Sequence, residues 1–494
     1  MKRLALLLAA LCGSIATAAP ATAPGLRAGA ATSNITPELG LRIVGGFAPY
    51  PAEHVHDELH ARCLVLDDGR TKLALVVCDL LGLHRSLSIE ARRLIQEGTG
   101  IPPENVMISA THTHSAASAL GSNRYGNDQP LDDYQRFVAR RIADGVRRAV
   151  NLLRPAHVAF GTVDVPEHLN NRRWLMREGK TPLNPFGKMD RVKMNPTPGS
   201  ADMLEPAGPI DPTVSFIALR EPDGRPISVY AAYSLHYVGG VGPRHISADY
   251  YGVFCETLKK LHGSDDAGTP FVALLANGTS GDINYTSFRT PRPRKQPYEQ
   301  INYVARDLAG KVNAALATVT WKDKAELAAR FREPGIPWRT IDAELLQWAR
   351  DVETKAPRLP KGDVPVGAKW PTTPDYVQRL SYAGRVQALA GSEQPTKIPL
   401  QVLRIGDICI GTSPCETFAE MGLEFKKRSP FPQSFMVELN HGYIGYLPTP
   451  RHFELGGYET WPGTNYLEPQ ASVKMLDSLI EMAGELKAAP SKAR

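Results

Sequence analysis

Short apolar runs alternate along the chain with longer segments in which apolar residues recur every three or four positions. The short runs predict buried strands, and the periodic segments predict amphipathic helices. The predicted strands cover residues 29–36, 62–66, 72–78, 105–115, 157–165, 213–220, 228–236, 271–276, 398–403, 408–411 and 435–440. The predicted helices cover 86–96, 132–153, 249–261, 299–319 and 470–488. This order indicates an α/β fold in which mixed β-sheets are flanked by helices, and the sequence contains no apparent repeat.

Two regions interrupt the regular pattern. Residues 182–212 contain seven prolines and no periodicity, which predicts a long surface insertion of the kind that often borders a binding site. Residues 325–395 predict a mostly helical accessory region, interrupted by a proline-rich linker at 356–374. Both regions are expected to belong to one large domain, 19–494.

The first residues have the pattern of a cleavable signal peptide, predicted to span 1–18. Lys2 and Arg3 precede an apolar run from Leu4 to Ile15, and Ala16-Thr17-Ala18 offers a small-residue cleavage site. The apolar run is too short to cross a bilayer, and no later segment resembles a membrane span. The sequence therefore predicts an exported protein, periplasmic or secreted, without a transmembrane segment.

Charge and cysteine content exclude some classes of partner. Without Lys2 and Arg3 the chain has 55 basic and 51 acidic residues, and this small excess is scattered rather than clustered. A nucleic-acid partner is therefore not expected. Cys63, Cys78 and the other cysteines after the signal peptide lie in apolar surroundings without a CxxC pair, which favours buried free thiols. One disulfide is compatible with this pattern, but a thiolate zinc site is not expected.

The segment Thr111-His-Thr-His-Ser115 has the strongest chemical signal in the chain. It follows an apolar strand, and side chains two positions apart in an extended chain point to the same side. His112 and His114 would therefore project together beyond a strand end, where α/β sheets usually hold their ligands. One imidazole could bind a metal while the other handles a proton. A strand-to-loop exit with two partly exposed histidines is the alternative.

A second histidine cluster contains His54, His56 and His60. Its glutamate is misplaced for the H-E-x-x-H motif of zinc proteases, so a loop leading into the next strand is favoured over a second metal site.

Three further places offer candidate residues. A predicted hairpin delivers His236 to a strand end beside glycines, and the glycine-rich turn 277–284 indicates a close approach of backbone to ligand. That turn is neither a Walker loop nor a nucleophile elbow. Glu416 is expected in the first turn of a helix, where a carboxylate favours the helix dipole.

Taken together, four motifs in this order resemble the catalytic domain of neutral/alkaline ceramidases. They are Thr-His-Thr-His-Ser at 111–115, Ser-Leu-His at 234–236, Pro-Cys-Glu at 414–416, and Gly-Tyr with Tyr-Glu at 445–446 and 458–459. Asn-Ile-Thr at 34–36, Asn171-Arg172, Ile246-Ser-Ala-Asp249 and Gly281-Asp282 fit the same order, so the resemblance spans nearly all of 19–494.

The resemblance implies a zinc-dependent amidohydrolase that cleaves an N-acylated (sphingo)lipid with zinc-activated water. Its implied zinc ligands are His112, His236, Glu416 and Tyr446. His114, Arg172 and Tyr458 would surround the reacting group as proton carrier and oxyanion donors. Two imidazoles and a carboxylate are a suitable ligand set for catalytic zinc.

Two departures from the family pattern bear on the substrate. The family has a serine shortly after its Gly-Asp, where this chain has Asn284, a residue that can orient a substrate but is no nucleophile. The chain also ends soon after the Tyr-Glu motif, so the family's C-terminal β-sandwich is expected to be absent. Two alternatives stay open: a zinc hydrolase of an ester or carbohydrate derivative on the same scaffold, and a non-catalytic binding module.

Overall fold

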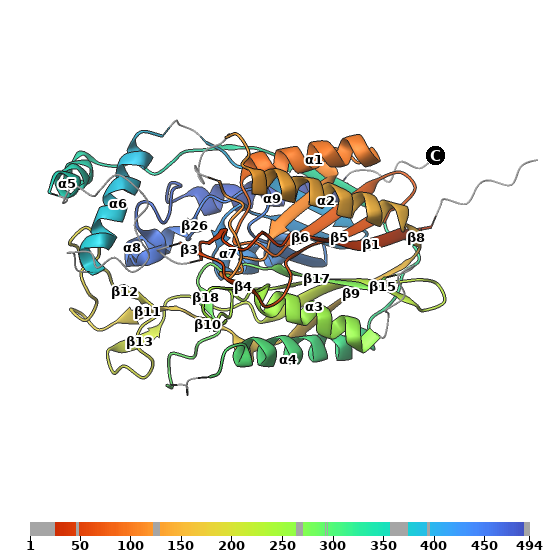
Figure 1. Cartoon of the computed structure of the whole chain (residues 1–494), viewed down its shortest axis with the longest axis horizontal. Coiled ribbons are helices and arrows are strands. Elements are labelled where there is room, and N and C mark those ends of the chain that lie inside the picture. The colour runs from red at the N-terminus through yellow and green to blue at the C-terminus, as the bar shows by residue number, and fades with distance from the viewer. Residues whose placement is uncertain are drawn as a thin grey trace, which may run out of the picture.

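The computed structural model describes residues 25–45, 49–121, 129–262, 270–291, 293, 295–355, 374–392 and 396–488. The predicted signal peptide lies outside these residues. Three mixed sheets form the body of the described structure, and helices lie on their outer faces (Figure 1). None of the described helices is both long and apolar enough to span a bilayer. The α/β class with mixed sheets and flanking helices, expected from the sequence, is confirmed.

One arrangement of four strands and two helices occurs three times. In the first unit the strands are β1 (Arg27–Asn34), β5 (His60–Asp67), β6 (Lys72–Cys78) and β7 (Val106–Ala110), with helices α1 (Arg85–Thr99) and α2 (Asp133–Asn151). The first three strands pair antiparallel in chain order, and the fourth pairs parallel to the third. A short strand, β8 (Arg154–Pro155), extends this sheet beside β1.

The second and third units have the same order and the same strand directions. The second contains β9 (His157–Asp164), β14 (Thr213–Arg220), β15 (Pro226–Tyr233), α3 (Asp249–His262), β17 (Val272–Asn277) and α4 (Glu299–Leu316). The third contains β19 (Leu327–Arg332), β22 (Leu400–Ile405), β23 (Ile408–Thr412), α7 (Ala419–Arg428), β25 (Gln433–Val437) and α9 (Ala471–Ala488). The expectation that the chain lacks an internal repeat is therefore wrong at the level of structure.

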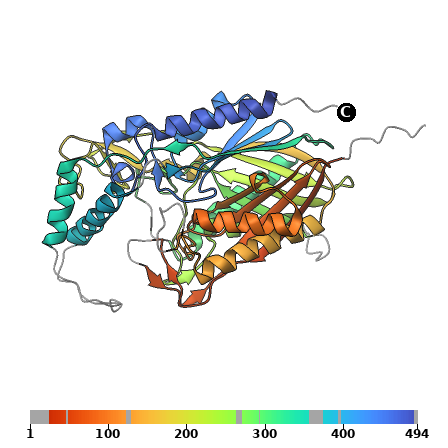
Figure 2. The ribbon, with the colours of Figure 1, turned by 90° about the horizontal axis from the view of Figure 1, so that it is seen from above.

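The three sheets share one hydrophobic core and use their other faces to bind helices. Buried residues of all three sheets meet in that core, among them Leu64, Leu75, Ile217, Leu274, Leu403 and Ile410. The outer faces pack separately against α1 with α2, α3 with α4, and α7 with α9. Figure 1 shows the first two helix pairs on opposite sides of the sheets, and Figure 2 shows α9 along a further side. A strand with two buried faces explains the nearly continuous apolar runs in the sequence.

Helix ends in the first unit follow from local capping residues. The His84 ring accepts a hydrogen bond from the Ser86 backbone NH at the start of α1, and Gly100 ends that helix in the left-handed conformation. At the start of α2, Asp132 and Gln135 form a reciprocal capping box. Such caps satisfy backbone groups that have no partner within the helix.

Strand direction determines where the connecting segments lie. The first, third and fourth strands of each unit run the same way. The segments that follow these strands therefore leave each sheet at the same end, where the carboxyl ends of the three strands lie. These segments contain the small elements β2 (Arg42–Ile43), β3 (Tyr50–Pro51), β4 (His54–Val55), β10 (Asn170–Asn171), β11 (Arg173–Met176), β12 (Val192–Met194), β13 (Met203–Pro206), β16 (His245–Ile246), α5 (Ala343–Thr354) and α6 (Pro374–Ala390). Figure 1 shows β11–β13, α5 and α6 at the end of the molecule opposite β8.

Two segments differ from the sequence prediction. The proline-rich insertion 182–212 contains β12 and β13, which flank β11 in a three-stranded sheet. The region 325–395 begins with β19, an outer strand of the third sheet, before its helices α5 and α6. Alanine and arginine in β19 favour a helix locally, but pairing with β22 overrides that preference. The prediction of buried free thiols is confirmed for all five cysteines in the described residues.

The close approach of β1 to the end of α2 makes a direct stability prediction. A Cβ atom on Gly29 would lie 2.2 Å from the Ala149 carbonyl oxygen, so Gly29→Ala forces the backbones apart. We expect a loss of about 1–3 kcal/mol in the free energy of unfolding, measured by urea denaturation with circular dichroism. Gly310→Ala in α4, where a Cβ would meet nothing within 4 Å, is the control. It should stabilise by about 0.5–1 kcal/mol, and equal effects of both changes would contradict the packing argument.

Candidate functional site

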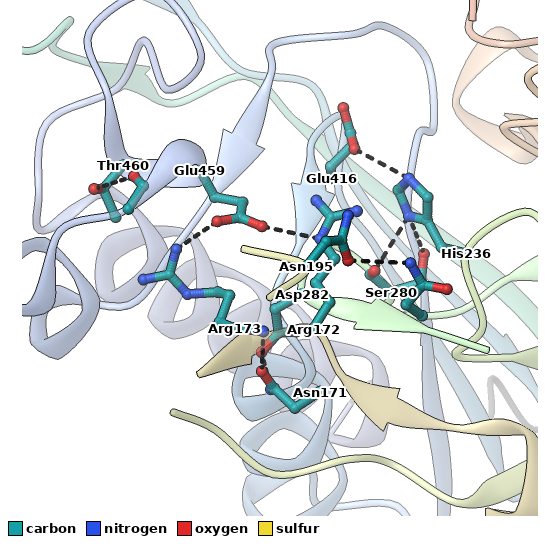
Figure 3. Close-up of polar contacts among 12 residues, drawn as sticks. Asn171, Arg172, Arg173, Asn195, His236, Ser280, Asp282, Glu416, Glu459 and Thr460 are labelled. Atoms are coloured by element: carbon teal, nitrogen blue, oxygen red, sulfur yellow. Dashed lines mark hydrogen bonds and ion pairs between the residues drawn. The ribbon is translucent and has the colours of Figure 1, made fainter. Parts of the chain in front are cut away.

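The candidate ligands lie just beyond strands of three different sheets. His112 and His114 follow β7, His236 follows β15, and Glu416 follows β23. Figure 3 shows the Glu416 carboxylate directed at the His236 ring, although these residues belong to different repeat units. The structure therefore brings together side chains that are hundreds of residues apart in the sequence.

Glu416 does not occupy the helix position predicted for it. It lies in the short strand β24 (Glu416–Thr417), which pairs parallel with β26 (Tyr446–Leu447), and α7 begins only at Ala419. The pairing sets Glu416 directly opposite Tyr446. The helix-dipole interpretation of this carboxylate is wrong, because backbone pairing fixes the residue before the helix starts.

Three imidazoles and one carboxylate converge within a few ångströms. Glu416 Oε2 lies 3.3 Å from His112 Nε2 and 3.8 Å from His236 Nε2. His114 Nε2 lies 3.1 Å from His112 Nε2, and one nitrogen from each histidine lies within 4.8 Å of the others. His114 also stacks on the Tyr237 ring, with centroids 3.7 Å apart. By distance alone, His114 is as well placed as His236 to share an ion with His112.

Hydrogen bonds at the opposite ring nitrogen orient two of these imidazoles. His112 Nδ1 lies 2.7 Å from the Leu81 carbonyl oxygen, which can only accept, so Nδ1 carries the proton. His236 Nδ1 lies 3.3 Å from both the carbonyl oxygen and Oγ of Ser280. Ser280 Oγ in turn donates to Glu438 Oε1 at 2.7 Å. Both histidines thus keep Nε2 as a lone-pair donor, the arrangement typical of metal-binding imidazoles.

Glu416 supplies a buried negative charge to this cluster. The Tyr443 hydroxyl donates to Oε1 at 2.6 Å, whereas Oε2 has no hydrogen-bond partner among the described residues. Burial alone would raise the pKa of Glu416, but His112 and the hydroxyls of Tyr443 and Tyr446 lower it to about 2. The carboxylate is therefore ionised.

His114 and His236 do not neutralise this charge at neutral pH. Burial holds the pKa values of His114 and His236 well below the ordinary value. An unpartnered carboxylate oxygen thus faces imidazole lone pairs, and such an arrangement fits a bound divalent cation. The side chains of His112, His236 and Glu416 therefore suit a divalent cation.

The remaining residues implied by the resemblance lie beside this cluster. The Arg172 guanidinium lies over the Tyr446 ring, 5.3 Å from its centroid, and the Tyr446 and Tyr458 rings are 5.7 Å apart. Arg172 Nε donates to Glu459 Oε1 at 2.9 Å, and Arg173 donates to the other oxygen at 2.5 Å. Figure 3 shows Arg172 between Glu459 on one side and Glu416 with His236 on the other.

Arg172 is held in its charged form. Burial opposes the charge, but Tyr446, Glu459 and Glu416 raise the pKa of Arg172 well above its ordinary value. Its Nη2 group is buried without a hydrogen-bond partner among the described residues. A charged donor with a free N–H beside the histidine cluster can stabilise negative charge on a bound molecule.

A cavity of about 200 Å³ opens onto the cluster. Its lining residues are Val44, Gly45, Pro49, Leu81, His112, His114, Arg385, Glu416, Tyr443, Tyr446, Tyr458, Gly463 and Thr464. Sequence reasoning missed Tyr443 and Arg385. Tyr443 stands three residues before Tyr446 in the same glycine-tyrosine segment, and nothing in the sequence separates it from a packing tyrosine.

Asn284 is placed apart from the cavity. It lies in β18 (Ile283–Asn284), paired with β10, and its amide nitrogen donates to Asn195 Oδ1 at 3.3 Å. Its oxygen accepts from the Thr286 backbone NH. Asn284 is not among the residues that line the cavity.

The fold of this chain is similar to that of solved structures, although its sequence matches no known family. No protein-family model matches the sequence, and a search of curated proteins found no match. Two solved structures superpose on 94% of this chain and on 75% of their own chains, each with 18% sequence identity. One is a ceramidase complexed with C2, with a TM-score of 0.66, and the other is the neutral ceramidase from Pseudomonas aeruginosa, with a TM-score of 0.64.

The chain has the neutral ceramidase fold. The fold that the sequence motifs implied is therefore confirmed. At 18% identity, the likeness is one of architecture.

The ion-pair network beside the candidate site makes a second stability prediction. Glu459 is fully buried between Arg172 and Arg173, so Glu459→Gln leaves two buried guanidinium groups without their counter-charge. We expect a loss of about 3–5 kcal/mol in the free energy of unfolding. Asp477→Asn removes the carboxylate of an exposed pair with Arg428 and should cost less than about 1 kcal/mol. Similar losses in both variants, measured by urea denaturation, would contradict the role of burial.

Proposed function

We propose that the protein is an exported zinc-dependent amidohydrolase of the neutral ceramidase type. Its substrate would be a lipid-like small molecule, an N-acylated (sphingo)lipid whose amide bond is cleaved by zinc-activated water. The observation that carries the proposal is the unpartnered oxygen of Glu416 facing the Nε2 atoms of His112 and His236. The neutral ceramidase fold supports it.

His112, His236 and Glu416 would hold the ion, with Tyr446 as a fourth ligand. Tyr446 is directly opposite Glu416 in the β24–β26 pair, so backbone hydrogen bonds hold its position relative to the carboxylate. A bound zinc ion would polarise the amide carbonyl and lower the pKa of a water molecule towards ~7. No nucleic acid is needed for this chemistry.

His114 is suited to carry the proton that the reaction moves. Hydrolysis forms a bond between water oxygen and the amide carbon, breaks the carbon–nitrogen bond, and transfers a proton from water to the leaving nitrogen. Burial lowers the pKa of His114 and so keeps its imidazole neutral, which leaves a ring nitrogen with a lone pair for that proton. Because the ring lies 3.1 Å from His112 Nε2 and lines the cavity, it stands beside the place where the bond breaks.

Arg172 and Tyr458 would stabilise the carbonyl oxygen as it gains negative charge. Arg172 has a buried N–H without a partner among the described residues, and Tyr458 lines the cavity. One such donor typically contributes about 3–4 kcal/mol to the transition state. Glu459 holds Arg172 in place through its 2.9 Å hydrogen bond.

A second candidate is a zinc hydrolase of an ester or a carbohydrate derivative. It is favoured by Asn284, which occupies the family's serine position, hydrogen-bonds Asn195 and does not line the cavity. A series of N-acyl substrates with shortened chains separates the two candidates. A lipid amidase loses kcat/KM as the chain shortens, whereas a carbohydrate-type enzyme does not.

The decisive experiment removes the two histidines separately. His112→Ala and His236→Ala should each bind about one zinc ion fewer per chain than wild type and should reduce turnover of a fluorescent ceramide at least ~10³-fold, because the ion supplies several kcal/mol of stabilisation. Zinc is counted by elemental analysis of the purified protein. His157→Ala, in β9 and away from the cavity, is the control. Unchanged zinc content in both site variants would refute the assignment.

A milder change tests the orientation of the carboxylate. Tyr443→Phe removes the 2.6 Å hydrogen bond to Glu416 while retaining the ring, so zinc affinity should fall about 10–100-fold. The affinity is measured by competition with a chromophoric chelator. Tyr303→Phe, on the exposed face of α4, is the matched control and should leave it unchanged. Equal affinities in the two variants would show that Glu416 needs no support from Tyr443.

A further inference from the structure

A second group of histidines lies outside the proposed active site. His54 and His56 meet His245, and one ring nitrogen from each lies within 4.8 Å of the others. We propose that these three residues bind a second transition-metal ion, with zinc as the first candidate. His60, the third histidine of the sequence cluster, does not belong to this group and lies 3.6 Å from Glu58 instead.

Backbone pairing, rather than chance side-chain proximity, builds this group. Strands β4 and β16 pair parallel, which sets His54 opposite His245. Hydrogen bonds from the Glu53 and His56 backbone NH groups to the carbonyls of Arg244 and Ile246, both 3.0 Å, continue the pairing. An ion pair between Arg244 and Glu53 closes it at one end. His56 directly follows β4, in a bend of the chain, and one of its ring nitrogens lies within 4.8 Å of nitrogens of His54 and His245.

The surroundings of His245 hold its ring in place. A Cβ atom on Gly242 would lie 2.4 Å from the His245 ring, so only glycine admits the ring at that position. His245 Nδ1 lies 2.6 Å from the Tyr298 hydroxyl, and the Tyr298 ring stacks on His56 with centroids 3.6 Å apart. Tyr298 thus contacts two of the three histidines. When Nδ1 donates to the Tyr298 oxygen, Nε2 is left as the ligand atom, a common orientation for metal-binding histidines.

The donor set selects the class of ion. Three imidazoles without thiolates suit Zn²⁺, Cu²⁺ or Ni²⁺ rather than Mg²⁺ or Ca²⁺, which prefer oxygen ligands. Tetrahedral zinc places its nitrogen ligands about 3.4 Å apart, and the three ring nitrogens here lie within 4.8 Å of one another. Because His54 and His56 are exposed, solvent or a ligand can reach a fourth position.

The position of the group suggests what the ion would do. Pro49, which lines the cavity, lies five residues before His54, and His245 lies nine residues after His236. The residues that follow His245 lead to the proposed active site. There the Ser247 backbone NH donates to the carbonyl of Ser115, the residue after His114, at 2.9 Å. An ion held by His54, His56 and His245 would fasten the connectors of the first and second units beside the cavity. Its role would be structural, separate from the proposed hydrolysis.

Zinc counting in four proteins tests the proposal. Tag-free wild type, His54→Ala/His56→Ala, His112→Ala/His236→Ala and the combined variant are stripped with chelator, dialysed against Zn²⁺ and analysed for metal. We expect two, one, one and no zinc ions per chain. Because His54 and His56 are exposed, their replacement should leave the circular dichroism spectrum unchanged. His157→Ala is the control for general loss of histidine.

The outcomes separate this proposal from the proposed function. Equal zinc content in wild type and His54→Ala/His56→Ala overturns the second site. A zinc-free His112→Ala/His236→Ala variant overturns it as well. If His54→Ala/His56→Ala loses one ion while His112→Ala/His236→Ala loses none, the second site stands and the proposed active site fails. In addition, Cu²⁺ bound to His112→Ala/His236→Ala should show nitrogen hyperfine splitting that the combined variant lacks.

Discussion

The common direction of three strands in every repeat unit is the constraint on which the rest of the structure depends. Because the first, third and fourth strands run the same way, their connectors leave each sheet at the same end. The shared core between the three sheets then brings those three ends together. His112, His236 and Glu416 meet at this place although they belong to different units. Sheets packed face to face lie only ~10 Å apart, so short connectors are enough to bring side chains of different sheets into contact.

This convergence also brings several buried carboxylates close together. They differ in the ion-pair and hydrogen-bond partners that stabilise them. Glu459 is held by two arginines. Glu438 accepts from the Ser280 hydroxyl and the Thr417 backbone NH, and burial raises its pKa well above the ordinary value. Glu416 is ionised and keeps an oxygen without a partner among the described residues. An unpaired buried charge costs several kcal/mol, which is a cost that a bound cation removes.

Most strands and helices of the three units could be predicted, because a clear apolar period marks them in the local sequence. The threefold repeat itself could not be predicted, because the hydrophobic pattern does not specify the order of strands in a sheet. Equivalent strands in the three units need to share only their apolar character. β24 was missed because a two-residue strand has no period, and its pairing with β26 comes from distant chain. Of the candidate site, the pattern of His112 and His114 could be derived from spacing. Arg172, Tyr446 and Tyr458 came from the family resemblance, and Tyr443 emerged only from its contact with Glu416.

The three candidate ligands occupy related positions in the three repeat units. In each unit, one strand of the parallel pair leads to a ligand and its neighbour leads to the group that orients that ligand. β7 leads to His112, and the connector after β6 supplies the Leu81 carbonyl that fixes its ring. β15 leads to His236, and β17 leads to Ser280. β23 leads to Glu416, and the connector after β25 supplies the Tyr443 hydroxyl. The parallel pair thus supplies a candidate ligand in every unit, after its fourth strand in the first unit and after its third strand in the other two, and the candidate metal site forms only where the three units converge.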